Sequence, residues 1–389
     1  MNKSTFIPYS KQTISENDIK RVCEVLRSPL ITQGPKVEEF EKNISKEVNS
    51  KYSVAVNSAT SALHIACLAL KLKKTDILWT TPITFVASAN CGRYCGAKID
   101  FVDIEQKTGL MSIRSLEEKL IYAEKNGTLP KIVIPVHLAG SSCDMNKIWK
   151  LSKKYNFKVI EDASHAIGGS YRNEPVGCCK FSDICIFSFH PVKIITTGEG
   201  GVATTNSQEL EIKMKRLRSH GITKDKNKFK SLQANEWVYE QQELGFNYRM
   251  SDIHASLGLS QLERLKEIVK ERNIQYKIYE RLLANSKMSM IDIPKDVYSA
   301  LHLGIIRLNL SDKKKYKIIF EKMRENGIGV QLHYIPVHLQ PYYQELGFSK
   351  GMYKNSEDYA TNSLSIPLYP GLSEEEQNMV IKLLEEIRV

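Results

Sequence analysis

Between residues 50 and 205, short apolar runs alternate with stretches of helical periodicity, and this alternation leaves few folds open. Runs that are apolar at nearly every position are typical of parallel strands buried on both faces. Strands that alternate with helices favour an α/β fold with a mostly parallel central sheet. We expect strands at residues 53–56, 77–80, 99–104, 132–137, 159–162, 184–189 and 202–205, and helices at residues 59–70 and 145–155.

The pattern changes after Gly245. Leu262, Leu265, Val269 and Tyr276 are spaced as on one face of a long helix. Beyond residue 286 we expect a small α+β region with strands at 303–308 and 329–333 and helices at 314–325 and 374–387. A chain of 389 residues has room for roughly two or three domains. We therefore predict a large α/β domain (1–250), a connecting long helix (251–285) and a small C-terminal α+β domain (286–389).

Charge and composition favour some classes of protein over others. The net charge of +11 suits nucleic acid, acidic membranes or phosphorylated small molecules. The basic residues are spread out, and no RRM, zinc-finger or homeodomain pattern occurs, which favours a solvated lysine-rich surface. The eight cysteines form no CxxC pair, so the spacing predicts no metal site. No apolar stretch approaches the ~20 residues of a membrane span, and the start lacks a signal-peptide core, so we expect a cytoplasmic protein.

Ligands of open α/β sheets bind beyond the carboxyl ends of the strands, so the residues that follow each expected strand are the candidates for ligand binding. Residues 57–62, all small or hydroxyl-bearing except the first, open a helix after the first strand. They could bind a phosphate at the helix N-terminus or form an ordinary N-cap. Phe85 follows the second strand, where it could stack on a flat ring or belong to the core.

Two ionisable residues complete this set. Asp162 ends the run 159–162, where it could pair with a protonated ring nitrogen, form a salt bridge or cap a helix. Lys193 follows the run 184–189 and precedes a glycine-rich turn, where it could form a Schiff base or be a surface lysine. Together, the four features are the parts that pyridoxal phosphate (PLP) requires. The glycines at 198–201 lack GxGxxG spacing and precede a strand, which argues against a dinucleotide site.

From Tyr9 to about Leu368, the chain resembles the PLP-dependent sugar aminotransferases of the DegT/DnrJ type. The matching segments are 57–64 (NSATSALH), 82–85 (PITF), 161–166 (EDASHA), 187–193 (FSFHPVK), 218–221 (RSHG), 245–250 (GFNYRM) and 333–338 (HYIPVH). The resemblance implies the aspartate-aminotransferase-like fold (PLP fold type I) and a homodimer with shared active sites. A lysine-rich stretch at 224–237 departs from the family pattern.

The resemblance also implies a role for each matching residue. Lys193 would bind PLP covalently, and its presence argues for amino transfer, because dehydratases among the relatives carry histidine there. Asp162 would pair with the ring nitrogen, Phe85 would stack on the ring, and His165 would lie close by. The phosphate would be bound by Ala59, Thr60, Ser61 and Ser188, and by Asn247 of the other subunit. The sugar-nucleotide side would be lined by Tyr9, Pro29, Leu30, Ile31, Thr32, Arg249, His333, Tyr334 and Ile335.

Within the family, residues 57–61, 137–145 and 193–201 are most similar to enzymes of the pseudaminic acid pathway. We therefore expect transfer of the amino group of L-glutamate to carbon 4 of a UDP-linked 4-keto-6-deoxy-N-acetylhexosamine, UDP-2-acetamido-2,6-dideoxy-β-L-arabino-hexos-4-ulose. The same chemistry on a different 4-keto nucleotide sugar is the main alternative. A nucleic-acid-binding regulator that uses the positive charge is a remote one.

Overall fold

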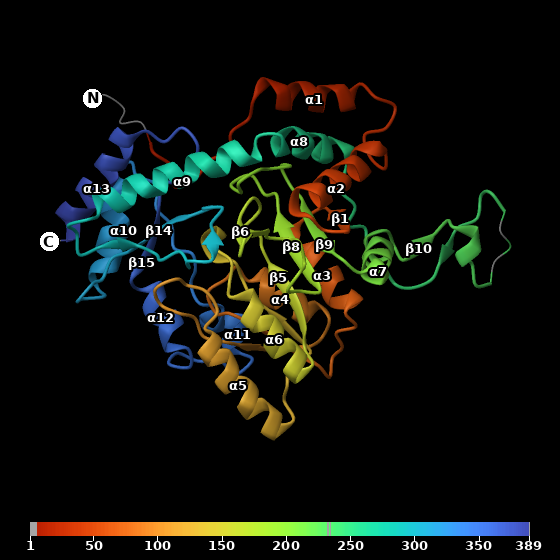
Figure 1. The fold of residues 1–389 in the computed structure, drawn as a ribbon, viewed down its shortest axis with the longest axis horizontal. Coiled ribbons are helices and arrows are strands. Elements are labelled where there is room, and N and C mark those ends of the chain that lie inside the picture. The colour runs from red at the N-terminus through yellow and green to blue at the C-terminus, as the bar shows by residue number, and fades with distance from the viewer. Residues whose placement is uncertain (1–5, 232, 234, 389) are drawn as a thin grey trace.

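The computed structural model describes residues 6–231, 233 and 235–388, and a seven-stranded sheet forms its centre (Figure 1). Neighbouring strands are parallel except β9, which runs antiparallel to both β1 and β8. The predicted α/β fold with a mostly parallel central sheet is therefore confirmed. In spatial order the strands are β1 (Tyr52–Val56), β9 (Gly201–Thr205), β8 (Ile184–Ser188), β5 (Lys158–Asp162), β4 (Ile132–Ile134), β2 (Ile77–Thr80) and β3 (Lys98–Phe101).

Three of these strands end earlier than the apolar runs predict, β8 by a single residue and β3 and β4 by three. β4 stops at Ile134 because Pro135 follows, and proline has no N–H to donate to a ladder. Beyond it, Val136 forms only an isolated bridge with Asp162. β3 stops at Phe101, and Ile104 pairs with Met111 instead of a sheet strand. The apolar residues beyond the ends of β3 and β4, Val102, Ile104 and Val136, are buried although they are not in the sheet.

Helices cover both faces of this sheet, and alternate strand residues point to opposite faces. Val54, Ile160 and Ile184 pack with α3 (Ala59–Ala69), α4 (Ala87–Tyr94) and α7 (Gln208–Arg218). Val133 and Val159 belong to the opposite core. The helices of that opposite face are α2 (Pro35–Val48), α5 (Ile113–Asn126), α6 (Met145–Tyr155) and α8 (Asp252–Leu262). Whether a residue stands at an odd or an even position of its strand therefore decides on which face of the sheet its side chain lies.

Local capping explains where several of these helices begin. A serine or aspartate side chain accepts a hydrogen bond from a backbone N–H of the first turn, which otherwise lacks an acceptor. The capping residues are Ser58 (α3), Ser112 (α5), Asp144 (α6), Ser207 (α7) and Ser251 (α8). The N-cap interpretation of Ser58 is thus correct.

The prediction of a single long helix over 251–285 is wrong. The chain forms two helices, α8 (Asp252–Leu262) and α9 (Leu265–Leu282), with a turn at Glu263 and Arg264. Leu262 therefore does not share a helix with the other periodic residues. The two helices have different partners: α8 packs against α1 (Glu16–Leu26) and α2, whereas α9 packs against α13 (Glu374–Arg388). Arg264 at the turn forms an ion pair with the buried Asp18 of α1, which anchors the bend.

The C-terminal region contains a small antiparallel sheet with its own core. Its strands are β12 (Ser289–Met290), β14 (Gly304–Arg307) and β15 (Ser363–Ile366), and α9, α10 (Lys315–Glu325) and α13 pack on it. The prediction of a strand at 329–333 is wrong. The backbone N–H of Gly329 bonds to Ile7, while Gln331 pairs with Ser365. Because its hydrogen bonds go to two different segments, this stretch forms isolated contacts rather than a ladder.

Part of the C-terminal region packs on the large core. Tyr343 and Tyr353 belong to the cluster on the α3/α4 face, and backbone N–H groups at the N-terminus of α12 (Lys354–Ala360) donate to Asp103. The proposed division at residues 250 and 285 stays a prediction. The remaining short elements are η1 (Leu138–Gly140), β6 (Ser170–Tyr171), β7 (Glu174–Pro175), β13 (Val297–Tyr298), η3 (Val337–Leu339), α11 (Pro341–Gln344) and α12 (Lys354–Ala360).

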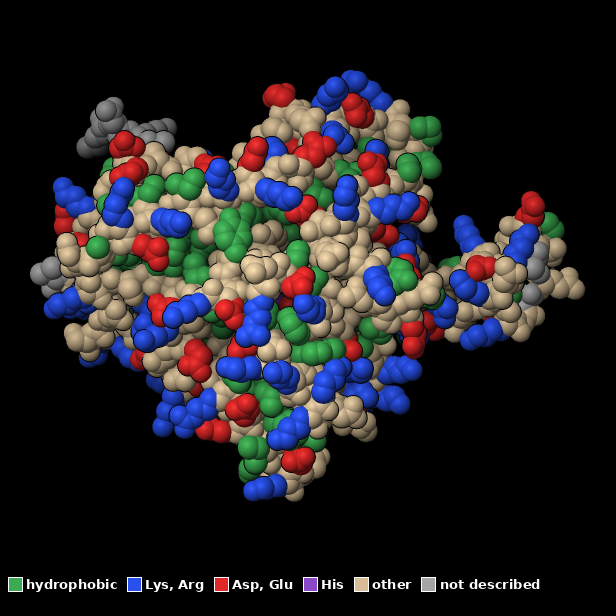
Figure 2. Space-filling model, viewed as in Figure 1, with side chains coloured by type: hydrophobic (Ala, Val, Ile, Leu, Met, Phe, Trp, Pro, Cys, Tyr) green, Lys and Arg blue, Asp and Glu red, His purple; other side chains and the backbone are tan. Residues whose placement is uncertain are grey.

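The lysine-rich stretch at 224–237 lies in an arm that projects from the body (Figure 1). The arm holds β10 (Ile222–Thr223), η2 (Lys226–Lys228) and β11 (Glu240–Gln241); residues 232 and 234 are outside the described residues. Elsewhere on the face shown in Figure 2, Lys and Arg side chains are scattered rather than gathered in one patch. Among the described residues, no helix combines the length and apolar character that crossing a membrane requires.

Candidate active site

A cavity of about 390 Å³ lies where the chain leaves the carboxyl ends of β1, β2, β5 and β8. Its wall includes Ser58 after β1, Phe85 after β2, Asp162 at the end of β5 and Ser188 at the end of β8. The C-terminal region closes the cavity with two histidines and a tyrosine, His302, His333 and Tyr334. Segments from both parts of the chain therefore build one site.

One end of the cavity is suited to an anion. Ala59 and Thr60 line it at the N-terminus of α3, where backbone N–H groups and the helix dipole attract negative charge. Ser188 adds a hydroxyl from β8. Gly201 of β9 is necessary here, because a Cβ atom on it would lie 2.5 Å from the backbone nitrogen of Ala59. Ser61 does not line the cavity; its hydroxyl donates to Asn57 Oδ1 at 2.7 Å.

Asp162 lies in the middle of the cavity wall, and neighbouring donors hold its carboxylate in place. Ser88 of α4 donates its hydroxyl to Asp162 Oδ2 at 2.5 Å, and the Ser164 N–H donates to Oδ1 at 3.1 Å. The side chain is buried on the α3/α4 face, as its parity on β5 requires. The adjacent Glu161 serves the opposite face, where it bonds to His137 and Ser182.

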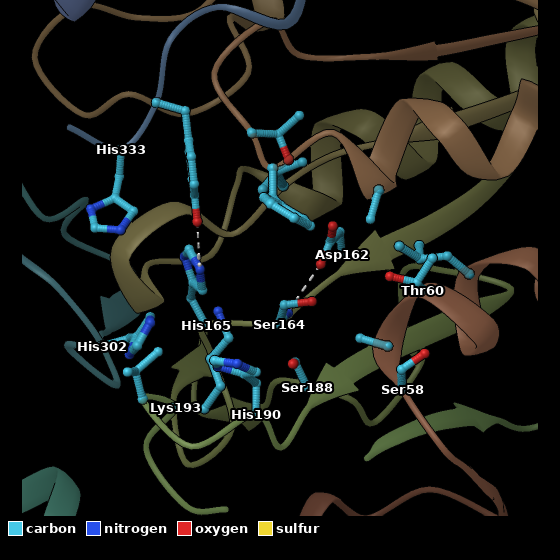
Figure 3. A pocket seen from close by; sticks show the side chains of 18 of the residues that line it. Ser58, Thr60, Asp162, Ser164, His165, Ser188, His190, Lys193, His302 and His333 are labelled. Atoms are coloured by element: carbon cyan, nitrogen blue, oxygen red, sulfur yellow. Dashed lines mark hydrogen bonds between the residues drawn. The ribbon is translucent and has the colours of Figure 1, made fainter. Parts of the chain in front are cut away.

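Lys193 lies at the other end of the cavity, whose lining also includes His165, His190, His302 and His333 (Figure 3). Burial lowers the pKa of Lys193 to about 8, although the charge of Asp162 raises it. Burial and the nearby lysine also hold the pKa of His165 and of His302 well below the ordinary range. The same causes lower the pKa of His333 to about 3. At neutral pH these imidazoles are uncharged, and Lys193 is closer to its neutral amine form than an ordinary lysine.

Aromatic side chains form the open wall of the cavity. Phe85 is 59% exposed, so the alternative that it belongs to the core is wrong. Its ring lies 6.4 Å from that of Tyr334, measured between centroids. The Tyr334 hydroxyl lies 3.2 Å from His165 Nε2, and the rings of Tyr9 and His333 are 5.5 Å apart. A flat ligand can therefore stack on the exposed Phe85 ring, with the polar Tyr334 hydroxyl beside it.

Several residues that the resemblance assigns to the site lie elsewhere in this chain. Pro29 and Leu30 line a separate surface hollow beside α1, and Arg249 lines another beside α2. Asn247 is exposed, and its backbone pairs with Ser219. The remaining three, Ile31, Thr32 and Ile335, are exposed and do not line the cavity.

Sequence reasoning missed some residues that the fold brings to the cavity. His302 lies directly before the expected strand at 303–308, and this position beside a strand was the only signal. Ser88, the donor to Asp162, lies one helical turn beyond Phe85 on α4. Ser164, His190 and Glu199 also line the cavity, from segments that the sequence had already singled out.

The residues present fit PLP. An anion-binding helix terminus lies at one end, a fixed carboxylate in the middle and a lysine with a lowered pKa at the other end. In Figure 3, Ser58 and Thr60 lie on the side opposite His302 and His333, with Asp162 and Ser188 between them. PLP carries a phosphate, a ring nitrogen and an aldehyde, and the cavity holds a matching partner for each of them.

The lowered pKa of Lys193 predicts a pH dependence. Only the neutral amine attacks an aldehyde, so the rate at which the cofactor-free protein binds PLP covalently should rise with pH and level off above about pH 8. An ordinary lysine would give a rise centred near pH ~10.4. The appearance of the protein-bound absorbance after mixing with PLP measures this rate. A rate that kept rising through pH 10 would contradict the burial of the amine.

Comparisons with known proteins agree with this geometry. Residues 12–385 match the DegT/DnrJ/EryC1/StrS aminotransferase family. UDP-4-amino-4,6-dideoxy-N-acetyl-β-L-altrosamine transaminase of Campylobacter jejuni (strain 81-176) is 37% identical over 387 residues, 98% of each chain. The structure of PseC of Helicobacter pylori, an aminotransferase of pseudoaminic acid biosynthesis, superposes with a TM-score of 0.89 at 30% identity, covering 99% of each chain. The PLP form of Spr1654 from Streptococcus pneumoniae gives 0.89 at 29% identity, covering 99% and 100%.

Proposed function

Because this chain belongs to the DegT/DnrJ/EryC1/StrS aminotransferase family and is a PLP-dependent sugar aminotransferase, we propose a specific substrate pair for it. The amino donor is L-glutamate. The acceptor is carbon 4 of UDP-2-acetamido-2,6-dideoxy-β-L-arabino-hexos-4-ulose, a UDP-4-keto-6-deoxy-N-acetylhexosamine, in pseudaminic acid biosynthesis. The observation that supports this choice is the 37% identity, over nearly the full length of both chains, with the transaminase named for the corresponding 4-amino sugar.

The site residues have clear tasks in such a reaction. Bound PLP supplies an electron sink for the carbanion that forms next to the transferred nitrogen. Lys193 Nζ, which loses its proton more readily than an ordinary lysine because burial lowers its pKa to about 8, takes the proton from the α-carbon of glutamate and returns a proton in the second half-reaction. Asp162 keeps positive charge at the ring nitrogen. The N-terminus of α3 and Ser188 hold the phosphate, which fixes the reacting atoms relative to Lys193.

The substrate assignment is tested by the product. Purified protein is incubated with L-glutamate and, separately, with each candidate 4-keto UDP-sugar, and the products are identified by NMR. We expect 2-oxoglutarate and the 4-amino sugar of the proposed acceptor, at a higher kcat/KM than with any epimer. Faster amination of a different 4-keto nucleotide sugar would show that the proposed acceptor is wrong. It would not contradict the aminotransferase reaction. The Lys193→Ala variant serves as the inactive control.

A homodimer with shared sites is part of the same proposal. Asn247, Arg249 and residues 29–32 are assigned to the site by resemblance, yet none of them lines the cavity of their own chain. Asn247 and most of 29–32 are exposed, so a second copy of the chain could receive them. In this arrangement, Asn247 of each subunit binds the cofactor phosphate of the other.

Mixed dimers test this arrangement. Asn247→Ala should weaken the site, because losing a hydrogen bond to a charged group costs about 1.5–3 kcal/mol. When Lys193→Ala and Asn247→Ala subunits are dissociated and re-paired, each mixed dimer has one complete site and one doubly defective site. Activity should reach at most about a quarter of wild type, because about half of the dimers are mixed and each has one working site of two. No gain over the two re-paired parents would place Asn247 in its own chain's site or in none.

The proposal includes a cytoplasmic location. All eight cysteines are free thiols, five of them buried. Unpaired thiols in this number are usual in a reducing compartment.

A further inference from the structure

Two adjacent carboxylates of β5 each accept a hydrogen bond from a serine hydroxyl. Ser88 Oγ donates to Asp162 Oδ2 at 2.5 Å in the wall of the cavity. Ser182 Oγ donates to Glu161 Oε1 outside the cavity. All four side chains are buried. The first pair has an additional partner, because the hydroxyl of the buried Thr84 lies 2.7 Å from Ser88 Oγ. A chain of two hydroxyl groups therefore ends at Asp162.

The chemistry of the members fixes the direction of this chain. A serine hydroxyl has one proton to donate, whereas an ionised carboxylate and a backbone carbonyl can only accept. Besides Thr84, the acceptors near Ser88 Oγ are Asp162 Oδ2 and the Phe85 carbonyl oxygen, which is more distant at 3.4 Å. Because Ser88 uses its proton for Asp162, Thr84 must be the donor to Ser88. The hydrogen bonds therefore run from Thr84 through Ser88 to the carboxylate.

We propose that Ser88 and Thr84 are positioning residues that act on the cofactor through Asp162. The Ser164 N–H donates to the other carboxylate oxygen at 3.1 Å, so each oxygen of Asp162 accepts from a fixed donor (Figure 3). The Ser88 hydroxyl stabilises the negative charge and keeps the carboxylate from turning. Thr84 strengthens this bond, because hydrogen bonds in a chain polarise one another. Their role rests on the proposed contact of Asp162 with the ring nitrogen of PLP.

The segment that holds the two hydroxyls is shaped by its backbone. The Ser88 N–H donates to the Phe85 carbonyl oxygen at 3.3 Å, at the turn that leads into α4. This turn places Phe85 in the cavity wall and Thr84 and Ser88 behind it. Because the turn uses backbone groups, a side-chain substitution can remove one hydroxyl without removing the turn. The hydroxyls can therefore be tested one at a time.

Matched substitutions at the two serines test this role on the PLP-loaded protein. Ser88→Ala and Ser182→Ala each remove a buried donor from a carboxylate of β5, so both should lower the thermal midpoint of unfolding. Only Ser88→Ala should also lower kcat and the PLP affinity measured by equilibrium dialysis, each by about tenfold or more, as expected for a lost hydrogen bond to a charged group. Wild-type values of both in Ser88→Ala, or equal losses in Ser182→Ala, would overturn the proposal.

Thr84 allows a test in which the shape of the side chain is kept. Thr84→Val removes the hydroxyl and retains the branched side chain, whereas Thr84→Ser retains the hydroxyl. We expect PLP affinity about threefold lower in Thr84→Val, the loss typical of a hydrogen bond between neutral groups, and wild-type affinity in Thr84→Ser. Equal PLP affinity of the two variants would overturn the role of the Thr84 hydroxyl.

A double substitution separates this role from that of Asp162 itself. Combined with Asp162→Asn, Ser88→Ala should change kcat and PLP affinity by less than about twofold, because residues that act as one unit are not additive. The full loss of the single Ser88→Ala variant in this background would show that Ser88 does not act through Asp162 and would overturn the proposal. Near-normal turnover of Asp162→Asn alone would overturn the role of Asp162, and this proposal with it.

Discussion

Lys193→Ala should lose the absorbance of covalently bound PLP and reduce turnover by at least roughly 10²–10⁴-fold, the range for a general acid–base group. The physical reason is that no other lysine lines the cavity among the described residues, so neither covalent attachment nor proton transfer has a substitute. The variant should remain folded, because the Lys193 side chain lines the cavity and is not part of the apolar core clusters.

Absorbance spectra, steady-state turnover and the thermal midpoint of unfolding measure these three outcomes. Lys180→Ala is the matched control, because Lys180 is an exposed lysine outside the cavity that forms a surface ion pair with Glu174 and lies over the Phe181 ring. It should behave as wild type in all three. Normal turnover of Lys193→Ala, or borohydride reduction that labels a different lysine, would remove Lys193 from its role.

Asp162→Asn should retain some PLP binding but lose roughly 10²-fold or more in turnover. A carboxylate next to the ring nitrogen favours its protonated form, and the neutral amide does not. Binding survives in part because the phosphate end of the cavity is built by other residues, Ala59, Thr60 and Ser188. Titration with PLP and steady-state kinetics separate the two effects. Near-normal turnover would mean that a different group protonates the ring.

Glu161→Gln provides the matched control for this variant. Glu161 is the adjacent carboxylate on β5, but it serves the opposite face of the sheet. His137 Nε2 lies 2.8 Å from the Glu161 carboxylate, and Cys143 and Glu161 raise the pKa of His137 although burial alone would lower it. Breaking a buried pair costs about 3–5 kcal/mol of stability. Glu161→Gln should therefore unfold at lower temperature but keep the turnover of the folded protein, the reverse of Asp162→Asn.

The apolar pattern of the sequence predicted the central sheet well, because such a pattern reports burial directly. It was less reliable at the ends of strands. Ile104 and Val136 are apolar and buried, yet they lie beyond the ladders of β3 and β4. The prediction of a strand at 329–333 failed for a related reason. Whether this stretch forms a strand depends on the partners of its backbone hydrogen bonds, and these partners, Ile7 and Ser365, are far away in sequence.

For the site, the sequence by itself determined the chemical parts. Residues 59–60, Phe85, Asp162 and Lys193 each follow a strand of one parallel sheet, and the strand ends of such a sheet converge at one edge. Their meeting is therefore a consequence of local pattern plus topology. The family resemblance added the roles that no local pattern could supply.

Only the tertiary structure decided which histidines surround Lys193 and which assigned residues lie outside the cavity. His302 reaches His165, at a ring distance of 4.5 Å, only because the C-terminal region folds back over the sheet. Asn247 and Arg249 stay outside their own cavity. Local sequence encodes periodicity and turn chemistry, whereas contacts between distant segments depend on how whole elements pack, and no short pattern records that.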